Sequence, residues 1–508
     1  MTWVSSFEGS SISPAIGALI ATVVIVVGLR WWSREFWKEK SRISKFAMTL
    51  PGPARLPILG NILELWETDK TVNTLTRIGQ EINSRLYQFW LGPTVVKIIV
   101  TDPKDLEIAY MSTKAADKDD VYKFMEPAVI NGLINAPGSL HYRTHKNLMM
   151  PQINGNSVMR KHVEEFNNQS QILVQQLKKK VDAQQFDIHD YINFCLGDAV
   201  FVTLFGVPGT AQLGEPSIFL LLTQTCLHSV YYRMMRPWLA PNILFRLTQR
   251  GRDYFRVVKE GHQYLDDIIA DKKRNYERRS PEETAELPLL DFLIDHVMIN
   301  NDWTDEELRY EMVTIFVASY ETMTGVACFA LLMIAMHPEV QRKAREEVEN
   351  VMRCDNISES EIANLKYLEM IVRETVRLFP VAPLMPRKVN ADLKLSTCTV
   401  PKGTSLFLLP YATHMDPELW DEPKKFIPER FTPENSKNRH PFAYIPFSGG
   451  MRSCPGSKYG AVGVKVLLAH VLRNYHLSTT MKLETLRVHN HISARSVDGY
   501  QISLKSVN

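Results

Sequence analysis

A ten-residue stretch near the C-terminus, FSGGMRSCPG at residues 447–456, sets one cysteine among glycines, an arginine and a proline. Glycines lack a Cβ, so this backbone can bend around Cys454 and approach a flat group closely. Pro455 suits the first position of a helix, which would bring exposed N–H groups and the positive dipole end near the sulfur and favour its ionised form. The stretch predicts a thiolate ligand loop for haem iron. A buried cysteine in a glycine-rich turn is the alternative.

Arg452 lies two residues before the cysteine, so in an extended segment it points to the same side and can pair with a haem propionate. The string F-x-x-G-x-R-x-C-x-G is complete as Phe447, Gly450, Arg452, Cys454 and Gly456. It resembles the cysteine-ligand signature of the cytochrome P-450 superfamily. The resemblance implies that fold, mainly α with small β-sheets, and haem b with Cys454 as its metal ligand. It also implies that Phe447, Arg452 and Gly456 contact the cofactor.

The composition is that of an ordinary globular protein with ample core, with 45% hydrophobic and 23% charged residues among 508. A net charge of +3 is too balanced to indicate nucleic-acid binding as the main activity. The six cysteines are scattered without a C-x-x-C pair, so neither a zinc site nor a disulfide framework is indicated, and the composition fits a reducing compartment.

An uncharged run of 18 residues, ISPAIGALIATVVIVVGL at 12–29, reaches the length of a membrane-spanning helix. Trp3, Trp31, Trp32 and Trp37 bracket it, and Lys and Arg residues follow it. We therefore expect a single-pass N-terminal anchor in the endoplasmic reticulum membrane, with the rest of the chain facing the cytosol. A cleaved signal peptide is the alternative.

Proline and glycine then mark a boundary, in P-G-P at residues 51–53 and P-I-L-G-N at residues 57–61. Proline fixes φ and glycine permits the bends between, so residues 51–61 form a stiff hinge like that of microsomal members of the superfamily. An ordinary proline-rich linker is the alternative. The expected organisation is an anchor with its basic flank at 1–50, the hinge at 51–61 and a haem-thiolate catalytic domain at 62–508.

A capping box at Thr304 and Glu307 opens an apolar pattern that runs to Pro338, so the sequence predicts a helix of roughly 30 residues. In its middle, Glu321 and Thr322 stand side by side in an apolar run. Polar groups there need partners or a chemical role. The simpler interpretation has Thr322 bonding a carbonyl one turn back and Glu321 reaching solvent.

The string around this pair, Ala318 to Thr322, resembles the superfamily motif A-G-x-D/E-T-T. The resemblance implies that Glu321 and Thr322 are catalytic and deliver protons to dioxygen. Ser319 departs from the usual glycine and Met323 from the second threonine. Ala318 stands where some fatty-acid hydroxylases carry a glutamate that bonds covalently to haem, so we expect a haem that is non-covalent apart from thiolate ligation.

Three more residues resemble haem-contacting positions. Tyr142 and Lys146 replace the tryptophan and arginine of the superfamily pattern W-x-x-x-R, and lysine lacks the bidentate fork of arginine. Arg387 matches a position that pairs with a propionate. A solvated basic helix face, for the first two, and an exposed turn arginine, for the third, are the alternatives.

Glu374 and Arg377, three residues apart in the helical run KYLEMIVRETVRLFP, share one helix side. With Arg430 of the later string P-E-R-F they resemble a buried Glu-Arg-Arg network of the superfamily, which is structural. Removing one partner should cost several kcal/mol because charge is left unpaired.

The resemblance implies a monooxygenase that inserts one oxygen atom of O2 into an apolar substrate such as a lipid, fatty acid, steroid or xenobiotic. The sequences of residues 366–380 and 435–450 are most similar to those of the animal fatty-acid omega-hydroxylase branch. Electrons would come from NADPH through NADPH-cytochrome reductase, with Lys146 and Lys458 as docking charges and cytochrome b5 as a second candidate partner. A haem-thiolate isomerase or dehydratase that acts on a peroxide without a reductase, and a non-catalytic haem carrier, are the alternatives.

Overall fold

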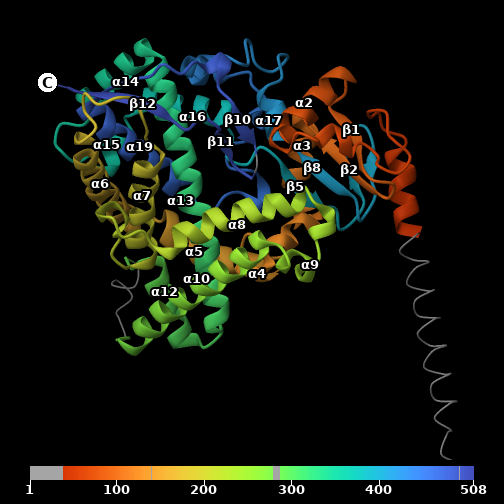
Figure 1. The fold of residues 1–508 in the computed structure, drawn as a ribbon, viewed down its shortest axis with the longest axis horizontal. Helices are drawn as coiled ribbons and strands as arrows, with labels where there is room; N and C mark the ends of the chain where they lie inside the picture. The colour runs from red at the N-terminus through yellow and green to blue at the C-terminus, as the bar shows by residue number, and fades with distance from the viewer. Residues whose placement is uncertain (1–37, 139, 278–285, 491, 508) are drawn as a thin grey trace, which may run out of the picture.

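The computed structural model describes residues 38–507 apart from 139, 278–285 and 491. A helical body fills one side of Figure 1 and a sheet-rich part the other. The prediction of a mainly α fold with small sheets is confirmed. The predicted membrane span at 12–29 lies outside the described residues. Among the helices that are described, only α13 has the length and apolar composition of a membrane span, and it lies in the protein core.

Helices occur in both parts of the molecule. They are α2 (Thr71–Glu81), α3 (Pro103–Met111), α4 (Glu126–Val129), α5 (Leu140–Asn154), α6 (Asn156–Lys178), α7 (His189–Val200), α8 (Ile218–Met234), α9 (Asn242–Arg246), α10 (Gln249–Arg274), α12 (Leu289–Asn300), α13 (Asp305–Met336), α14 (Pro338–Val351), α15 (Glu359–Ile362), α16 (Lys366–Leu378), α17 (Pro410–His414), α18 (Pro433–Ser436) and α19 (Ser457–Asn474).

The main sheet has five strands in the order β1-β2-β8-β5-β3, with β2 and β8 parallel and the other neighbours antiparallel. Its strands are β1 (Leu86–Leu91), β2 (Val95–Val100), β8 (Ser405–Leu408), β5 (Met385–Lys388) and β3 (Asp117–Lys118). Strand β2 is the apolar run VVKIIV. Small sheets pair β10 (Val488–Asn490) with β11 (Ala494–Ser496), β6 (Leu393–Lys394) with β7 (Thr399–Val400), and β4 (Phe186–Asp187), β12 (Gln501–Ser506) and β9 (Tyr475–Ser478) in the order β4-β12-β9.

The central element is α13, which begins at the predicted capping box and runs for 32 residues. It packs against α7, α16 and α19, and most of its side chains are buried in the largest hydrophobic cluster. A helix that is apolar on nearly all sides is stable only when neighbours surround it. Polar groups in its middle are therefore largely removed from solvent.

The hinge segment is attached to the edge of the main sheet. Gln88 donates its backbone N–H to Pro51 O at 2.9 Å, and Asn61 Oδ1 accepts the Trp90 N–H at 3.0 Å. Gly60 has φ +62°, and a Cβ there would lie 2.6 Å from Trp90 O. The left-handed turn therefore requires glycine. Residues 51–61 are thus fixed to β1 and are not a free linker.

The predicted Glu-Arg-Arg network is present and buried. Glu374 and Arg377 are fully buried, and Arg377 forms bonds of 2.7 and 2.9 Å with the two carboxylate oxygens of Glu374. Arg430 Nε lies 3.3 Å from Glu374 Oε1. The remaining Arg377 donors bind carbonyls, including His414 O at 2.8 Å. This network stabilises the segment that leads to the cysteine loop.

His414 extends the network towards that loop, because its Nε2 accepts the Ile445 N–H at 3.0 Å. Burial, followed by the neighbouring Arg377, lowers the pKa of His414 to about 3, and burial lowers those of His162 and His470 to about 4. All three are neutral in the folded protein at pH 7. Their unfolded counterparts take up protons below about pH 6.5.

We expect the free energy of unfolding to fall on acidification through these histidines. The pKa of each histidine is lower in the folded protein than in the unfolded chain. Its contribution to the free energy of unfolding is therefore fully present above about pH 6.5 and is lost as the pH falls towards the folded pKa. From pH 6.5 to 5 the loss is about 2 kcal/mol per histidine. Denaturant midpoints at pH 7 and pH 5 measure it. His414→Gln, which retains an acceptor for Ile445, should show a smaller drop, and an equal drop would contradict the assignment to His414.

Candidate active site

The cysteine loop closes before its helix begins. Cys454 donates its backbone N–H to Phe447 O at 2.9 Å, and Asn154 Nδ2 donates to Pro455 O. Helix α19 therefore starts at Ser457 with Gly456 as its N-cap residue, and the expectation that Pro455 is the first helical residue is wrong. Because the loop carbonyls are used by partners outside the helix, helical geometry begins two residues later.

The glycines of the loop serve two purposes. Gly450 has φ +62°, and a Cβ there would lie 2.2 Å from Tyr110 O, so the close approach of loop and α3 requires glycine. A Cβ at Gly456 would meet no atom within 4 Å. Phe447 is 41% exposed, although its neighbours in sequence are more buried. Open space therefore lies beside the cysteine.

Two effects oppose each other at the Cys454 thiol. Burial raises its pKa, whereas the Gly456 backbone N–H and the nearby Lys146 lower it. The expected stabilisation of the thiolate by a backbone N–H is present, but burial outweighs it. Coordination to a metal ion deprotonates a thiol outright, so the loop favours a thiolate that is ionised through ligation.

Tyr142 and Lys146, one turn apart on α5, direct their polar atoms to the cysteine loop. Tyr142 Oη donates to Met451 O at 3.2 Å. Lys146 Nζ binds Met451 O at 3.1 Å and Ser453 O at 2.8 Å. Both predicted cofactor-binding residues thus hold the loop backbone in this structure, and their contact with haem stays a prediction.

Arg387, on β5, provides the clearest sign of an anionic group. Its side chain is 1% exposed, and neither Nη1 nor Nη2 has a hydrogen-bond partner. Burial, together with Arg387 and Arg452, lowers the pKa of the nearby Lys118 well below the usual range. A buried guanidinium without an acceptor is costly unless an anion completes it. A haem propionate fits this requirement.

Arg452 lies beside this cluster, but the protein already occupies its donors. Nε binds Ala116 O at 2.9 Å, Nη1 binds Leu133 O at 3.4 Å and Nη2 binds Ala136 O. Its guanidinium carbon lies 3.9 Å from the centre of the Tyr142 ring. The predicted propionate contact of Arg452 therefore stays a prediction, and its observed contacts fix the loop to residues 116–136.

The acid and the alcohol on α13 are held differently. Thr322 Oγ1 donates to Ala318 O at 2.9 Å or Ser319 O at 3.1 Å, as the simpler interpretation expected. Glu321 is not directed to solvent. It is 4% exposed, and its Oε1 accepts Arg495 Nη2 at 2.5 Å and Nε at 3.1 Å, while Oε2 has no partner.

Arg495 and Ser493, which both donate to Glu321 Oε1, belong to the C-terminal β10–β11 hairpin. The sequence analysis did not identify either of them as a site residue. Burial disfavours the charged form of Arg495, but Glu321 raises its pKa above the usual value. Burial, Arg495 and other charges lower the pKa of His228 on α8, which places a third titratable group in this region. Nothing in the local sequence of Arg495 indicates a partner 174 residues away.

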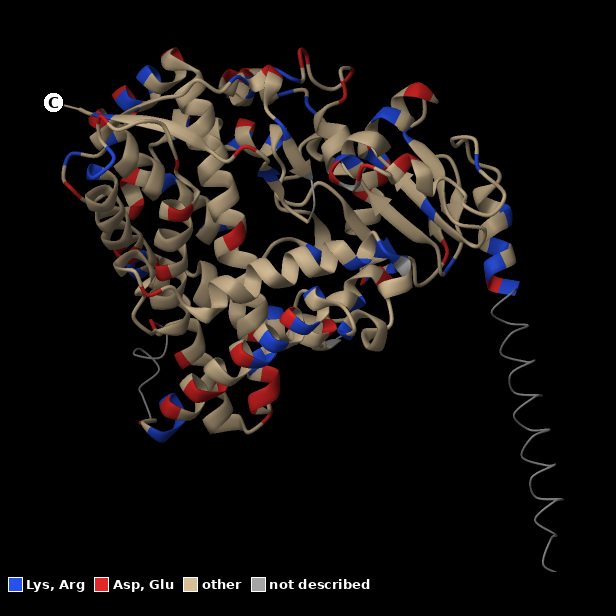
Figure 2. Ribbon diagram, in the orientation of Figure 1, with Lys and Arg blue, Asp and Glu red and all other residues tan. Residues whose placement is uncertain are grey.

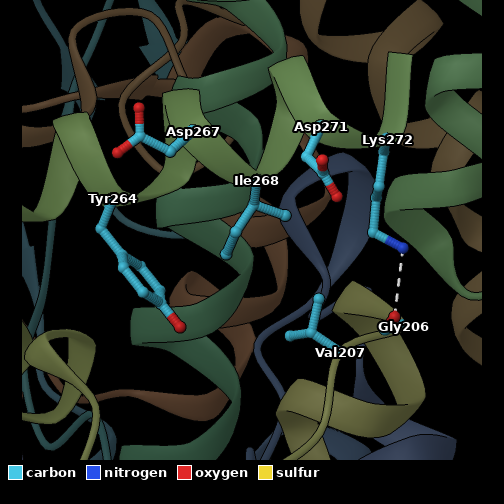
Figure 3. A pocket seen from close by; sticks show the side chains of 7 residues that line it. All are labelled: Gly206, Val207, Tyr264, Asp267, Ile268, Asp271 and Lys272. Carbon is cyan, nitrogen blue, oxygen red and sulfur yellow. Dashed lines mark hydrogen bonds between the residues drawn. The ribbon is translucent and has the colours of Figure 1, made fainter. Parts of the chain in front are cut away.

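A separate surface groove of about 480 Å³ lies between α10 and the end of the π-helical turn Phe201–Phe205. Figure 3 shows Lys272 reaching across it to Gly206 O, at 3.1 Å, with Asp267 and Asp271 on the same helix. It contains none of the predicted site residues. The predicted site residues come from the cysteine loop, α5, β5 and α13, and the β10–β11 hairpin adds Arg495.

The family model described as Cytochrome P450 matches residues 50–499. The chain belongs to the cytochrome P450 family. Cytochrome P450 4V2 of Mus musculus is 30% identical over 433 residues, covering 83% of this chain and 82% of that protein. Cytochrome P450 4c3 of Drosophila melanogaster is 26% identical over 517 residues, covering 97% and 95%. Probable cytochrome P450 4aa1 of the same organism is 28% identical and covers 90% of each chain.

As a cytochrome P450, the protein is a haem-thiolate monooxygenase that uses haem b and takes electrons from NADPH through a reductase. The predicted resemblance, reaction class and cofactor are confirmed, and the comparisons give no support for a peroxide isomerase or a carrier. Its substrates are apolar. Figure 2 shows acidic and basic residues spread over the whole molecule, in keeping with the small net charge.

Proposed function

We propose that the Cys454 thiolate would hold the haem iron of this cytochrome P450 and that Arg387 would pair with a haem propionate. The observation that carries this proposal is the buried Arg387 guanidinium with two unpaired nitrogens, on the same site as the cysteine loop. Phe447, Arg452 and Gly456 would border the cofactor on the cysteine side, and Tyr142 and Lys146 would hold the loop in register. Ala318 cannot form an ester, so the haem would be non-covalent apart from thiolate ligation.

When bound, the haem supplies the activation of O2, and the thiolate donates electron density that promotes O–O cleavage. The chain's own part is to hold and move protons. Glu321, whose Oε1 is paired with Arg495, would take up and release protons at Oε2, and Thr322 would pass them on by turning its hydroxyl away from Ala318 O. The unpartnered Oε2 of Glu321 supports this role, because it leaves one carboxylate oxygen ready to accept a proton.

The substrate we propose is a long-chain fatty acid. The support is the similarity of segments 366–380 and 435–450 to the fatty-acid omega-hydroxylase branch, and the relatedness to several cytochromes P450 of the 4 series. Glu321 lies in a largely apolar helix, which suits an alkyl chain near the reacting centre.

The proposed setting is the endoplasmic reticulum membrane, with residues 1–50 as the anchor and 62–508 as the catalytic domain facing the cytosol. Large apolar side chains that are exposed on the described part support membrane contact, among them Ile58, Trp66, Trp238, Ile243 and Leu247. The reductase, and cytochrome b5 with it, would dock by charge. Lys458 is 39% exposed but pairs with Glu359 at 3.1 Å, and Lys146 is engaged by the cysteine loop.

The test is turnover of the full-length protein with reductase, NADPH and labelled O2, with long-chain fatty acids as substrates. Wild-type protein should place one labelled oxygen atom in the product. Thr322→Val should lower the rate of product formation by about a hundredfold or more and raise peroxide release, because positioned proton transfer contributes about 10²- to 10⁴-fold. Thr324→Val, on the same helix at a hydroxyl without a partner, is the matched control.

Two outcomes would count against the proposal. Product without labelled oxygen and without NADPH would identify a peroxide-rearranging enzyme. Equal coupling in Thr322→Val and Thr324→Val would remove Thr322 from proton delivery. If fatty acids produce neither an optical shift of the haem protein nor product, while another lipid does, the substrate class is wrong although the reaction class holds.

A further inference from the structure

Two histidines one helical turn apart on α5 meet a buried carboxylate on α13. His141, His145 and Glu311 each offer one ligand atom, and these atoms all lie within 4.8 Å of one another. A contact of 2.8 Å between His145 Nδ1 and Glu311 Oε1 joins the two helices. None of the three residues has a role in the thiolate site.

The carboxylate of Glu311 is buried, with 1% of the residue exposed. Its Oε2 accepts the Leu133 N–H at 2.9 Å, which fixes the orientation of the group and leaves Oε1 facing the histidines. A buried carboxylate needs a cationic partner or several donors. A protonated His145 would supply one charge, and a divalent cation between the three residues would supply two.

The histidines are arranged so that a cation can join them. The His145 ring lies between the Trp303 ring, with centroids 3.9 Å apart, and the His141 ring, with centroids 3.8 Å apart. Trp303 shields one face of the group from water. His141 is half-buried, and one of its ring nitrogens lies within 4.8 Å of the ligand atoms of His145 and Glu311.

We propose that His141, His145 and Glu311 bind a zinc ion. Residues four apart on a helix lie on one face, as two imidazole ligands require. Two imidazoles and a carboxylate, without a thiolate, form a set that zinc accepts with a water in the fourth place. The Leu133 N–H is the outer partner that orients the carboxylate, as is usual at such sites.

The ion would act on the structure of the protein rather than as a reaction centre. It would fix α5 to α13 at a point one residue away from both Tyr142 and Lys146. Those two side chains hold the backbone of the cysteine loop, at Met451 and Ser453. Zinc would therefore stabilise the helix that holds the loop, while the loop keeps its own ligand.

The experiment uses full-length holoprotein without a histidine tag, stripped with a chelator and then given zinc. We expect elemental analysis to show one zinc per haem and zinc to raise the melting temperature, because an ion that binds only the folded state stabilises it. His141→Phe keeps an aromatic ring beside His145 but removes one ligand. It should weaken zinc binding at least about tenfold while leaving the haem spectrum unchanged. His476→Phe, at an exposed histidine on β9, is the matched control.

X-ray absorption at the zinc edge of the wild-type protein adds a readout that depends on no variant, and we expect two imidazole ligands and two oxygen ligands, one from Glu311 and one from water. Wild-type protein that binds no zinc, or that shows no imidazole at the zinc edge, would overturn the proposal. Zinc bound equally by His141→Phe and wild type would do the same, and His145 and Glu311 would then form only a buried pair that joins two helices.

Discussion

Cys454→Ser is expected to abolish monooxygenase turnover, with a remaining rate below about one-thousandth of wild type. Such a loss corresponds to about 4 kcal/mol of transition-state stabilisation. A serine hydroxyl stays protonated and donates little electron density to iron. A thiolate, in contrast, binds the iron as an anion and donates electron density to it. The measurement is product formation with reductase and NADPH, together with the absorbance of the reduced, carbon-monoxide-treated protein.

The matched control for this change is Cys354→Ser, because Cys354 is a free and exposed cysteine. It should leave both the absorbance and the rate as in wild type. If Cys454→Ser retained the absorbance maximum typical of thiolate ligation, another residue would be the ligand. Cys398, the other partly exposed cysteine, would then be the next to replace.

Glu374→Ala is expected to destabilise the protein by about 3 to 5 kcal/mol, because it leaves the fully buried Arg377 without its carboxylate. That is a large part of the 5 to 15 kcal/mol that holds a typical protein folded. We expect little haem-containing protein from expression and a lower denaturant midpoint for what is recovered. Arg342→Ala, which removes an exposed pair with Glu346, should change stability by no more than about 1 kcal/mol.

A second variant distinguishes lost charge balance from lost volume. Glu374→Leu combined with Arg377→Met replaces the ion pair by apolar groups of similar size, and such replacements are often tolerated better than a single deletion. We expect the double variant to be more stable than Glu374→Ala. A Glu374→Ala protein with wild-type stability would show that the network contributes little.

Local patterns predicted the parts of this protein that depend on neighbours in sequence. The capping box at Thr304 placed the start of α13 correctly, and the apolar run VVKIIV is strand β2. The Glu374–Arg377 spacing predicted a pair on one helix face. The third partner, Arg430, came only from resemblance, because no local rule joins residues 56 positions apart.

The contacts that the sequence did not reveal are those made by single side chains across long separations. Glu321 was expected to reach solvent, or to act with Thr322 alone, yet it pairs with Arg495 of the C-terminal hairpin. The positions of Tyr142 and Lys146 were predicted as haem contacts, but their donors reach loop carbonyls. Such pairings depend on how helices and hairpins pack, which periodicity does not encode.

The chain of bonds from Arg377 through His414 to Ile445 ends two residues before Phe447, at the entrance of the cysteine loop. Damage to the distant ion network is therefore transmitted to the cofactor pocket. Loss of haem during purification would therefore indicate a disturbed ion network as well as a missing iron ligand. The colour of a preparation is a direct measure of whether the protein is correctly folded.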